Sequence, residues 1–471
     1  MKVYPKFEYK FQIPWQTGAD FNLFQCVCRE NIPVPGNRHP ESINFGAHPL
    51  LQHEIRIEVI EYQTTIRQLS LFCIYFIRRW RDARALKQHS ISVAFFIALM
   101  CFELATARCV AVDTIDPLGG TSEPEKGLIW YDLQLLDVEG RGWTDTKSFY
   151  DRLPAKAETI VRPEVWRLSR QSSGLCVRFV TDATSLRVKW TLGLERLAEW
   201  NMPAAAISGL DLYVKHDGQW RWLAVGKPEK QTNEVNLFND ISHQKREFLL
   251  YLPLYNTVTS IALGLPMGAM LAKAESYAPD RKPIVFYGTS ITQGGCASRP
   301  GMVYTAILGR RLKRQVINLG FRANGNLDAE MAPLLSELDP SIYVLDCLPN
   351  LLAPEIAERV EPFVTVLRKA HPVTPILLVE DRTYPDGFLN SSRQERNVKS
   401  RAALRAAYDR LLNAGTRNVY YLHGTQLLGD DGEATVDASH PTDLGFVRMA
   451  DAFESVLRPI LSKQEAPPLS E

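Results

Sequence analysis

A serine that follows an apolar, strand-like run is the first residue whose position suggests chemistry. Residues 282–295 read KPIVFYGTSITQGG, so the run ends at Gly288 and Thr289 and Ser290 comes next. A serine at a strand–helix turn can present its Oγ as a nucleophile, and the start of the helix supplies free N–H groups for an oxyanion. The alternative is an ordinary strand–helix turn, in which Ser290 is only a helix N-cap.

A histidine close to an aspartate is the second candidate. Residues 437–442 read DASHPT, just before an expected helix. The carboxylate of Asp437 can hold Nδ1 of His440, which leaves Nε2 free to take a proton from a serine. A loop that merely caps the helix is the alternative. His371 and His423 have no such partner nearby, so we expect them to be structural or exposed.

Two further strand ends offer hydrogen-bond donors. Gly320 follows one expected strand in NLGF, and Asn350 follows the next in DCLPN. A backbone N–H and a side-chain amide at the same sheet edge suit an oxyanion hole, in which fixed donors meet the charge of a tetrahedral intermediate. Each residue alone is weak evidence, because Gly and Asn are common in loops.

These residues fall in a segment where strand-like and helical runs alternate. Such alternation predicts a parallel sheet covered by helices on both faces, with its active site beyond the carboxyl ends of the strands. The expected strands are 284–287, 315–319, 342–345, 375–379 and 418–422, and the expected helices are 303–312, 329–337, 355–370, 396–414 and 443–457. We therefore expect an α/β domain over residues 284–462, followed by a tail over 463–471.

The preceding segment, 121–270, has short strand-like runs separated by turn residues. The expected strands include 175–180, 185–191, 210–214, 220–225 and 248–252. Asp217-Gly218 lies between two of them and is typical of a hairpin turn. The spacing predicts an antiparallel β-sandwich, joined to the α/β domain by a linker over 271–283.

The sandwich segment is rich in aromatic residues. They are Trp130, Tyr131, Trp143, Trp166, Trp190, Trp200, Trp220 and Trp222. Tryptophans in a sandwich are more often core residues, although exposed ones could stack on sugar faces. Asp211, in the apolar stretch GLDLY, needs a partner, and we expect a backbone N–H rather than a catalytic role.

The first part of the chain shows no recognisable chemistry, and residues 1–85 stay unassigned. Residues 86–108 resemble a secretory signal peptide, because basic residues precede the apolar run 91–102 and the small residues at 105–107. Translation starting near Leu86 would make this an export signal to the periplasm or the cell exterior. The alternative is a buried or membrane-associated helix, and without export the protein would be cytoplasmic.

Composition narrows the classes of partner. The 471 residues include 54 basic and 53 acidic ones, giving a net charge of +1, so no electrostatic argument favours nucleic acid. We also expect no stable membrane insertion, and the oligomeric state is not indicated. The eight cysteines form neither a disulfide framework nor a zinc motif, and the expected chemistry requires no metal or cofactor.

Taken together, four blocks resemble those of the SGNH (GDSL-type) hydrolase superfamily. They are GTSITQGG, NLGFRANGN, DCLPN and DASHPTDLGF, and GLDLY with the sandwich resembles the N-terminal module of one branch. The resemblance implies a flavodoxin-like sheet with Ser290 as nucleophile, His440 as base and Asp437 as its orienter. It implies Ser290 N–H, Gly320 N–H and Asn350 as oxyanion donors.

The sequence departs from the superfamily pattern at three places. Thr289 replaces the usual aspartate before the serine, the third block reads Cys-Leu-Pro-Asn, and Arg322 stands where small residues are frequent. Arg322 could place a cation near the acyl pocket. Asp381 and Arg382 follow the fourth strand, and their role is open.

The resemblance implies a serine esterase that cleaves a short acyl ester, with a small molecule or a glycan ester as substrate. Two alternatives remain. An acyltransferase would use the same residues with a sugar or alcohol as acceptor. A carbohydrate-binding protein would carry the site only as a vestige.

Overall fold

The computed structural model describes residues 113–465. The unassigned region 1–85 and the signal-like segment 86–108 lie outside the described residues, so the interpretations given to them stay predictions. Within 113–465, none of the helices has both the length and the apolar character needed to cross a bilayer.

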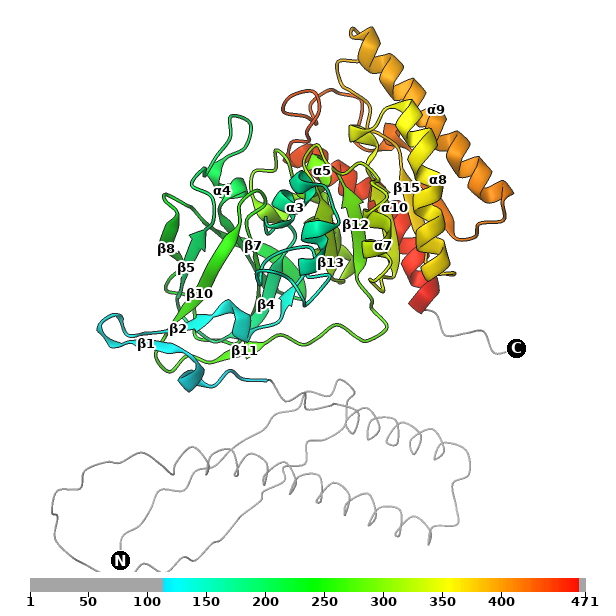
Figure 1. Ribbon diagram of the computed structural model, residues 1–471. Helices are drawn as coiled ribbons and strands as arrows, with labels where there is room; N and C mark the ends of the chain where they lie inside the picture. The colour runs from blue at the N-terminus through cyan, green and yellow to red at the C-terminus, as the bar shows by residue number, and fades with distance from the viewer. Residues whose placement is uncertain (1–112, 466–471) are drawn as a thin grey trace, which may run out of the picture. The chain divides into compact units, whose positions relative to one another are not determined.

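The first half of the described chain forms two antiparallel sheets (Figure 1). One has the order β1-β2-β10-β5-β8, and the other has the order β11-β4-β9-β6-β7, with β3 pairing with β4. The strands are β1 (Thr121–Glu123), β2 (Leu128–Asp132), β3 (Val138–Glu139), β4 (Cys176–Thr181), β5 (Leu186–Leu192), β6 (Leu210–His216), β7 (Gln219–Gly226), β8 (Thr232–Phe238), β9 (Arg246–Tyr251), β10 (Val258–Pro266) and β11 (Leu271–Lys273).

Period-two patterning explains these strands. Along β5 every second side chain is buried, from Leu186 to Leu192, and these side chains join those of the other sheet in one core. The predicted hairpin is also present, because β6 and β7 pair antiparallel around Asp217-Gly218 and both turn residues have positive φ. The predicted β-sandwich is thus confirmed.

One boundary differs from the prediction, and two short helices add to it. Residues 271–273, assigned to the linker, form β11, because their backbone pairs with residues 179–181 of β4. The sandwich half also contains the short helices α3 (Pro163–Ser169) and α4 (Ala204–Ile207). Each begins with a proline or directly after one, which favours the first turn of a helix.

The second half is a parallel sheet with the order β13-β12-β14-β15-β16, the flavodoxin-like order that the sequence predicted. Its strands are β12 (Ile284–Gly288), β13 (Val316–Gly320), β14 (Ile342–Asp346), β15 (Ile376–Val379) and β16 (Val419–Leu422). Its helices are α5 (Ser290–Gln293), α6 (Tyr304–Leu312), α7 (Met331–Leu335), α8 (Ala353–Ala370), α9 (Ser391–Asn413) and α10 (Asp443–Glu465).

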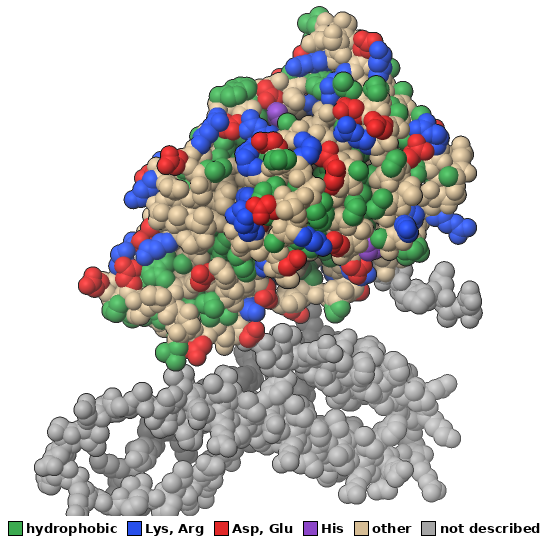
Figure 2. Space-filling view, in the orientation of Figure 1, with side chains coloured by type: hydrophobic (Ala, Val, Ile, Leu, Met, Phe, Trp, Pro, Cys, Tyr) green, Lys and Arg blue, Asp and Glu red, His purple; other side chains and the backbone are tan. Residues whose placement is uncertain are grey.

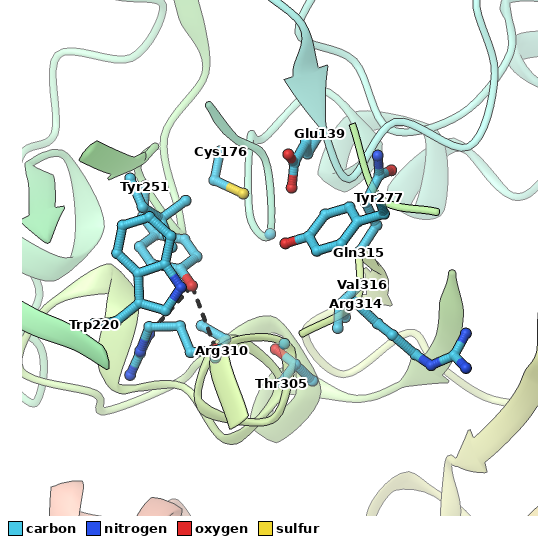
Figure 3. A pocket seen from close by; sticks show the side chains of 14 residues that line it. Glu139, Cys176, Trp220, Tyr251, Tyr277, Thr305, Arg310, Arg314, Gln315 and Val316 are labelled. Carbon is cyan, nitrogen blue, oxygen red and sulfur yellow. Dashed lines mark hydrogen bonds between the residues drawn. The ribbon is translucent and has the colours of Figure 1, made fainter. Parts of the chain in front are cut away.

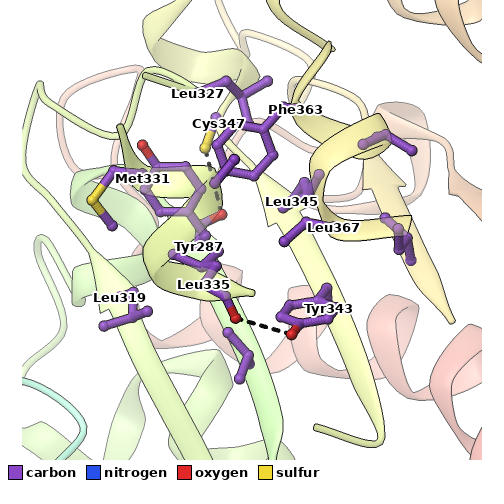
Figure 4. Close-up of a cluster of buried hydrophobic side chains, with 14 of the residues drawn as sticks. Tyr287, Leu319, Leu327, Met331, Leu335, Tyr343, Leu345, Cys347, Phe363 and Leu367 are labelled. Atoms are coloured by element: carbon purple, nitrogen blue, oxygen red, sulfur yellow. Dashed lines mark hydrogen bonds between the residues drawn. The ribbon is translucent and has the colours of Figure 1, made fainter. Parts of the chain in front are cut away.

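Alternate residues of β12 face opposite helical layers. Val285 and Tyr287 join a core with residues of α7, α8 and α9 (Figure 4), whereas Ile284 and Phe286 join a core with residues of α6 and α10. In Figure 1, α8 and α9 lie side by side on one face of the sheet. Both faces are therefore covered, as expected for continuous apolar strands.

Three helices exceed their predicted bounds, and α8 does so by two residues, since it begins at Ala353. Helix α9 begins at Ser391 because Asn390 caps it, its side chain accepting a hydrogen bond from Arg393 N. Helix α10 continues to Glu465 across Pro459, so the predicted tail at 463–471 was placed too early.

The sandwich and the α/β half share buried contacts. Asp211, fully buried, accepts hydrogen bonds from Gly301 N (2.7 Å), Trp222 Nε1 (2.9 Å) and Arg299 Nη1 (2.8 Å). The predicted backbone N–H partner is therefore present, and it comes from the α/β half. Burial raises the pKa of Asp211, although the Arg299 guanidinium opposes that effect.

A small cavity lies between the two halves. Its volume is about 30 Å³, enough for about one water molecule. It is lined by residues such as Tyr251, Tyr277 and Val316 (Figure 3). Because β13 begins at Val316, this cavity is at the amino end of the sheet, away from the candidate catalytic residues.

The aromatic residues divide between core and surface. The core prediction holds for Trp130, Trp143 and Trp190, which are at most 9% exposed. It is wrong for Trp200 and Trp222, which are 80% and 50% exposed. On the face shown in Figure 2, basic and acidic side chains are interspersed, in keeping with the near-zero net charge.

Candidate active site

Ser290 is the first residue of α5, directly beyond the carboxyl end of β12. The helix cap is Thr289, whose Oγ1 accepts a hydrogen bond from Ile291 N (3.2 Å). The threonine that replaces the usual aspartate thus performs the capping, and Ser290 is not used as the N-cap. The Oη of Tyr255, from the sandwich half, donates to Ser290 O (3.0 Å) and so helps to fix the position of this turn.

His440 reaches Ser290 from the loop before α10. Its Nε2 lies 2.8 Å from Ser290 Oγ, and its Nδ1 lies 2.8 Å from Asp437 Oδ2. Gly295 fits closely beside this ring, because a Cβ there would lie 3.0 Å from His440 Cδ2. The three side chains predicted as nucleophile, base and orienting carboxylate therefore lie in one hydrogen-bonded row.

Asp437 is held by hydrogen bonds on both carboxylate oxygens. Oδ1 accepts from the backbone N–H of Ser439 (3.1 Å) and of His440 (2.7 Å), while Oδ2 also accepts from Asn201 Nδ2 (3.1 Å). Burial alone would raise the pKa of Asp437, but the bonds from His440 and Asn201 bring it below its ordinary value. The carboxylate therefore stays charged beside the imidazole.

Gly320 does not fit the oxyanion role predicted for it. Its N–H donates to Asn318 Oδ1 (2.9 Å), and a Cβ at this position would lie only 2.2 Å from Gln293 N. Gly320 thus serves the close packing of β13 against α5, and its donor is already engaged. The sequence could not show this. A glycine at this position is expected both where a backbone N–H is left free for an oxyanion and where two backbone segments pack closely.

The turn after Gly320 lies against the end of β12, the strand that precedes Ser290. Gly325 packs on Gly288, since a Cβ at Gly325 would lie 1.8 Å from Gly288 O. Ala323, in the same turn, is exposed and has a φ of +55°, and no acceptor within residues 113–465 contacts its N–H. Asn350 Nδ2 lies 3.4 Å from Gly325 O, which places its amide beside the turn.

A loop of the sandwich also reaches the site, and sequence reasoning missed it. Glu199 Oε1 accepts from Arg322 Nη1 (2.6 Å), and Asn201 contacts Asp437 as described. Arg322 is therefore near the site, as the sequence suggested, but it is paired with a carboxylate. No local motif marks Glu199 or Asn201, because their partners lie more than 100 positions away in the sequence.

Arg382 holds the loop that carries His440. Its Nε donates to Ser439 O (3.0 Å), its Nη2 donates to Ser439 Oγ (2.5 Å), and its Nη1 pairs with Asp381. Both Asp381 and Arg382 are buried. The two residues whose role was open from sequence thus fix the position of the Asp437–His440 turn.

A buried carboxyl group lies beneath α5. Asp346 Oδ2 accepts from Tyr304 Oη (2.7 Å) and from Thr292 Oγ1 (3.1 Å). Burial raises the pKa of Asp346 to about 7, while these two hydrogen bonds oppose the shift. The group supports the helix that carries Ser290 and does not contact the serine.

One cluster has ligand atoms of the kind that bind metals. Atoms of Cys296, Asp437 and His440 lie within 4.8 Å of one another. Two of these side chains already bond to each other, and burial raises the pKa of the Cys296 thiol to about 12. A metal would therefore have to break the His440–Asp437 contact, which makes this a poor metal site.

The other histidines agree with expectation. His371 Nε2 lies 2.8 Å from Ser336 O, and His423 has a half-exposed side chain beside Glu380. Neither contacts Ser290.

Comparisons with known proteins agree with this geometry. Residues 281–458 match the GDSL-like lipase/acylhydrolase family, and residues 128–271 match the N-terminus of SGNH-hydrolase-type esterases. A crystal structure of a GDSL-like lipase from Bacteroides ovatus is 35% identical, with a TM-score of 0.68, over 71% of this chain and 98% of that chain. The chain belongs to the GDSL-like lipase/acylhydrolase family.

A second solved structure is more distant. The salicylyl-acyltransferase SsfX3 of a tetracycline biosynthetic pathway is 20% identical, with a TM-score of 0.57, over 75% of this chain and 98% of that chain. This likeness shows the fold alone. Comparison with curated protein sequences gave no match. The family predicted from the four sequence blocks, with its N-terminal module, is confirmed.

Proposed function

We propose that this GDSL-family protein is a serine esterase that hydrolyses a short acyl ester through an acyl-serine intermediate. The observation that carries the proposal is the unbroken chain from Ser290 Oγ through His440 to Asp437, with 2.8 Å at each step. These are hydrogen-bond distances, so His440 is placed to take the serine proton.

The mechanism follows from this chain. His440 takes the proton of Ser290 as Oγ attacks the ester carbonyl, and it then protonates the leaving alcohol. Water, deprotonated by the same histidine, attacks the acyl-serine and releases the acid. Asp437 keeps Nδ1 protonated and stabilises the imidazolium that forms. No step requires a metal or a cofactor.

The oxyanion is stabilised by donors at the strand ends. Ser290 N–H lies at the start of α5, and the Asn350 amide lies beside the turn that packs on Gly288. In place of the engaged Gly320 N–H, we assign the exposed N–H of Ala323 as the third donor. Such donors act best where they meet charge that develops in the transition state.

The surroundings favour a polar substrate. Charged and amide side chains lie around the turn that carries Ser290, namely those of Glu199, Arg322 and Asn350. Polar groups at the rim suit a small polar alcohol or a carbohydrate better than a long lipid chain. We therefore assign a short acyl group on a small or carbohydrate alcohol.

Hydrolysis of p-nitrophenyl acetate by the purified protein tests the proposal. Ser290→Ala and His440→Ala should each lower kcat by about a thousandfold or more, and Asp437→Ala should lower it less. Unchanged activity in Ser290→Ala would overturn the mechanism. Product analysis with added sugars or alcohols separates hydrolysis from acyl transfer, because a transferase would form a new ester.

A further inference from the structure

Trp200 is the most exposed tryptophan that the structure describes, at 80%. It is not part of the sandwich core, and it lies in the loop over residues 194–203, here called the sandwich loop. A large aromatic side chain left in water gains no burial energy within the fold, and tryptophan is enriched where proteins bind other molecules.

Both neighbours of Trp200 contact the candidate active site. Glu199 pairs with Arg322 (2.6 Å), in the turn that carries the Ala323 N–H, and Asn201 donates to Asp437 (3.1 Å). The backbone of Trp200 is thereby fixed between Arg322 and Asp437. The exposed indole is therefore carried by a segment that borders the candidate site.

The sandwich loop is held rigidly. Asn256, which is fully buried, accepts from Leu194 N (3.0 Å) and donates to Leu194 O (3.0 Å) and Ser208 Oγ (2.9 Å). Glu199 and Met202 exchange two backbone hydrogen bonds, and Met202 is 4% exposed. A side chain on such a preorganised loop loses little conformational freedom when a ligand binds.

We propose that Trp200 binds one face of a substrate ring, so that esters with a ring next to the ester bond are preferred. The ring face stacks on the indole while the ester carbonyl lies at Ser290. An aromatic acyl group and a sugar both offer such a face. The inference rests on the proposed esterase activity and specifies which esters that activity prefers.

The kinetic experiment compares three esters in the full chain. Methyl benzoate carries a ring in the acyl group, glucose pentaacetate carries a ring in the alcohol, and ethyl acetate carries none. In Trp200→Ala, kcat/KM should fall about tenfold for at least one ring ester and stay within about twofold for ethyl acetate. The ring ester that loses activity identifies which side of the ester stacks. Trp200→Phe should retain most of the ring preference.

Leu194→Ala is the matched control, because Leu194 is an exposed side chain (41%) of the same loop and only its backbone holds the loop. It should leave all three rates unchanged. An equal fall for all three esters in Trp200→Ala, or no change for any of them, would overturn the proposal.

Binding separates this inference from the esterase proposal. Calorimetry measures the binding of methyl benzoate and of glucose pentaacetate without any turnover. The proteins compared are Ser290→Ala and the double variant Ser290→Ala/Trp200→Ala. Weaker binding of either ring ester by the double variant supports ring recognition even if the wild type hydrolyses no ester. Equal binding of both esters by the two variants contradicts it.

Discussion

The side-chain amide of Asn201 donates to Asp437 Oδ2 across 3.1 Å, and the same oxygen lies 2.8 Å from His440 Nδ1. Asn201 belongs to the sandwich half, whereas Asp437 and His440 belong to the α/β half. A donor from the N-terminal module therefore fixes the carboxylate that orients the proposed base. A positioning group of this kind acts through Asp437 and does not touch the substrate.

Asn201→Ala should lower kcat by about tenfold, because hydrogen bonds to charged groups contribute about 1.5–3 kcal/mol. The hydrogen bond from Asn201 is one of the contacts that lower the pKa of Asp437, so removing it should also raise that pKa. A carboxyl whose pKa is lowered in the folded state adds to the free energy of unfolding at pH values above the ordinary aspartate pKa. This added stability is lost as the pH falls through the lowered pKa. The Tm deficit of Asn201→Ala should thus be largest near neutral pH and shrink in acid.

The control for this variant is Asn236→Ala, which removes an exposed amide bonded to Arg187 on an outer strand of the sandwich. It should retain full kcat. If Asn201→Ala also retained full kcat on an aryl ester, the positioning role would be wrong.

Asn350→Ala should lower kcat by about a hundredfold or more with little change in KM, as loss of one oxyanion donor does. The reason is that its amide lies beside the turn that packs on the nucleophile strand. Steady-state kinetics on p-nitrophenyl acetate measure both constants. Asn413→Ala, exposed at the end of α9, is the control and should behave as wild type. A rise in KM alone would instead indicate ground-state binding.

Arg382→Lys should lower kcat by roughly tenfold, because an ammonium cannot reproduce the two bonds of the guanidinium fork to Ser439. The turn between Asp437 and His440 would then lose its fixed position. Ser439→Ala, which loses only the Oγ bond, should show a smaller decrease. Arg410→Lys on the surface of α9 serves as control. Full kcat in Arg382→Lys would show that the turn is fixed without this residue.

The pH dependence of stability should reveal Asp346. Its pKa is raised from an ordinary 3.8 to about 7, so the folded protein keeps a proton that the unfolded chain releases. The contribution of this carboxyl to the free energy of unfolding therefore decreases as pH rises from about 3.8 to about 7, and it is constant above about pH 7. Asp346→Asn has no proton to exchange, and its Tm should fall less than that of the wild type from about pH 4 to about pH 7.

Thermal unfolding by circular dichroism across this range provides the measurement for Asp346. The exposed Asp409→Asn should follow the wild-type curve. Parallel curves for the wild type and Asp346→Asn would show that the buried carboxyl does not titrate in this range.

Ala323→Gly should keep activity and should not reduce stability. A non-glycine residue in the left-handed region costs about 1–2 kcal/mol, which the substitution relieves, and glycine still carries the proposed N–H donor. Part of the gain is offset by the flexibility of glycine in the unfolded chain. Ala329→Gly, at an exposed turn position whose φ is not positive, should instead lose about 0.4–1 kcal/mol through the greater freedom of the unfolded chain. Urea unfolding compares the two, and equal losses would contradict the strain at Ala323.

The parts of the fold that depend on local pattern could be predicted from the sequence. Continuous apolar runs such as 284–287 gave the strands of the parallel sheet, and Asp217-Gly218 gave the hairpin. Ser290, Asp437 and His440 were found because the first lies at a strand end and the other two are three residues apart. These signals depend only on chain neighbours and on the rule that strand ends share one sheet edge.

The remaining features depend on contacts that no local pattern encodes. Asn201 reaches Asp437 across 236 positions, and Glu199 reaches Arg322 across 123. Gly320 was assigned as a donor because its type and position fit, but its N–H is engaged by a side chain two residues earlier. Whether a backbone donor is free depends on rotamers and packing, which a single sequence does not show.

Arg152 sets a limit on how this enzyme can be engineered. It is 1% exposed and donates to the carbonyls of Leu168 and Gln171 on its own side and of Asn318 and Gly320 on the other. A truncated hydrolase half would lose the donor for the last two carbonyls, at the strand end that packs against the nucleophile helix. A replacement N-terminal module would therefore have to supply another donor to the carbonyls of Asn318 and Gly320.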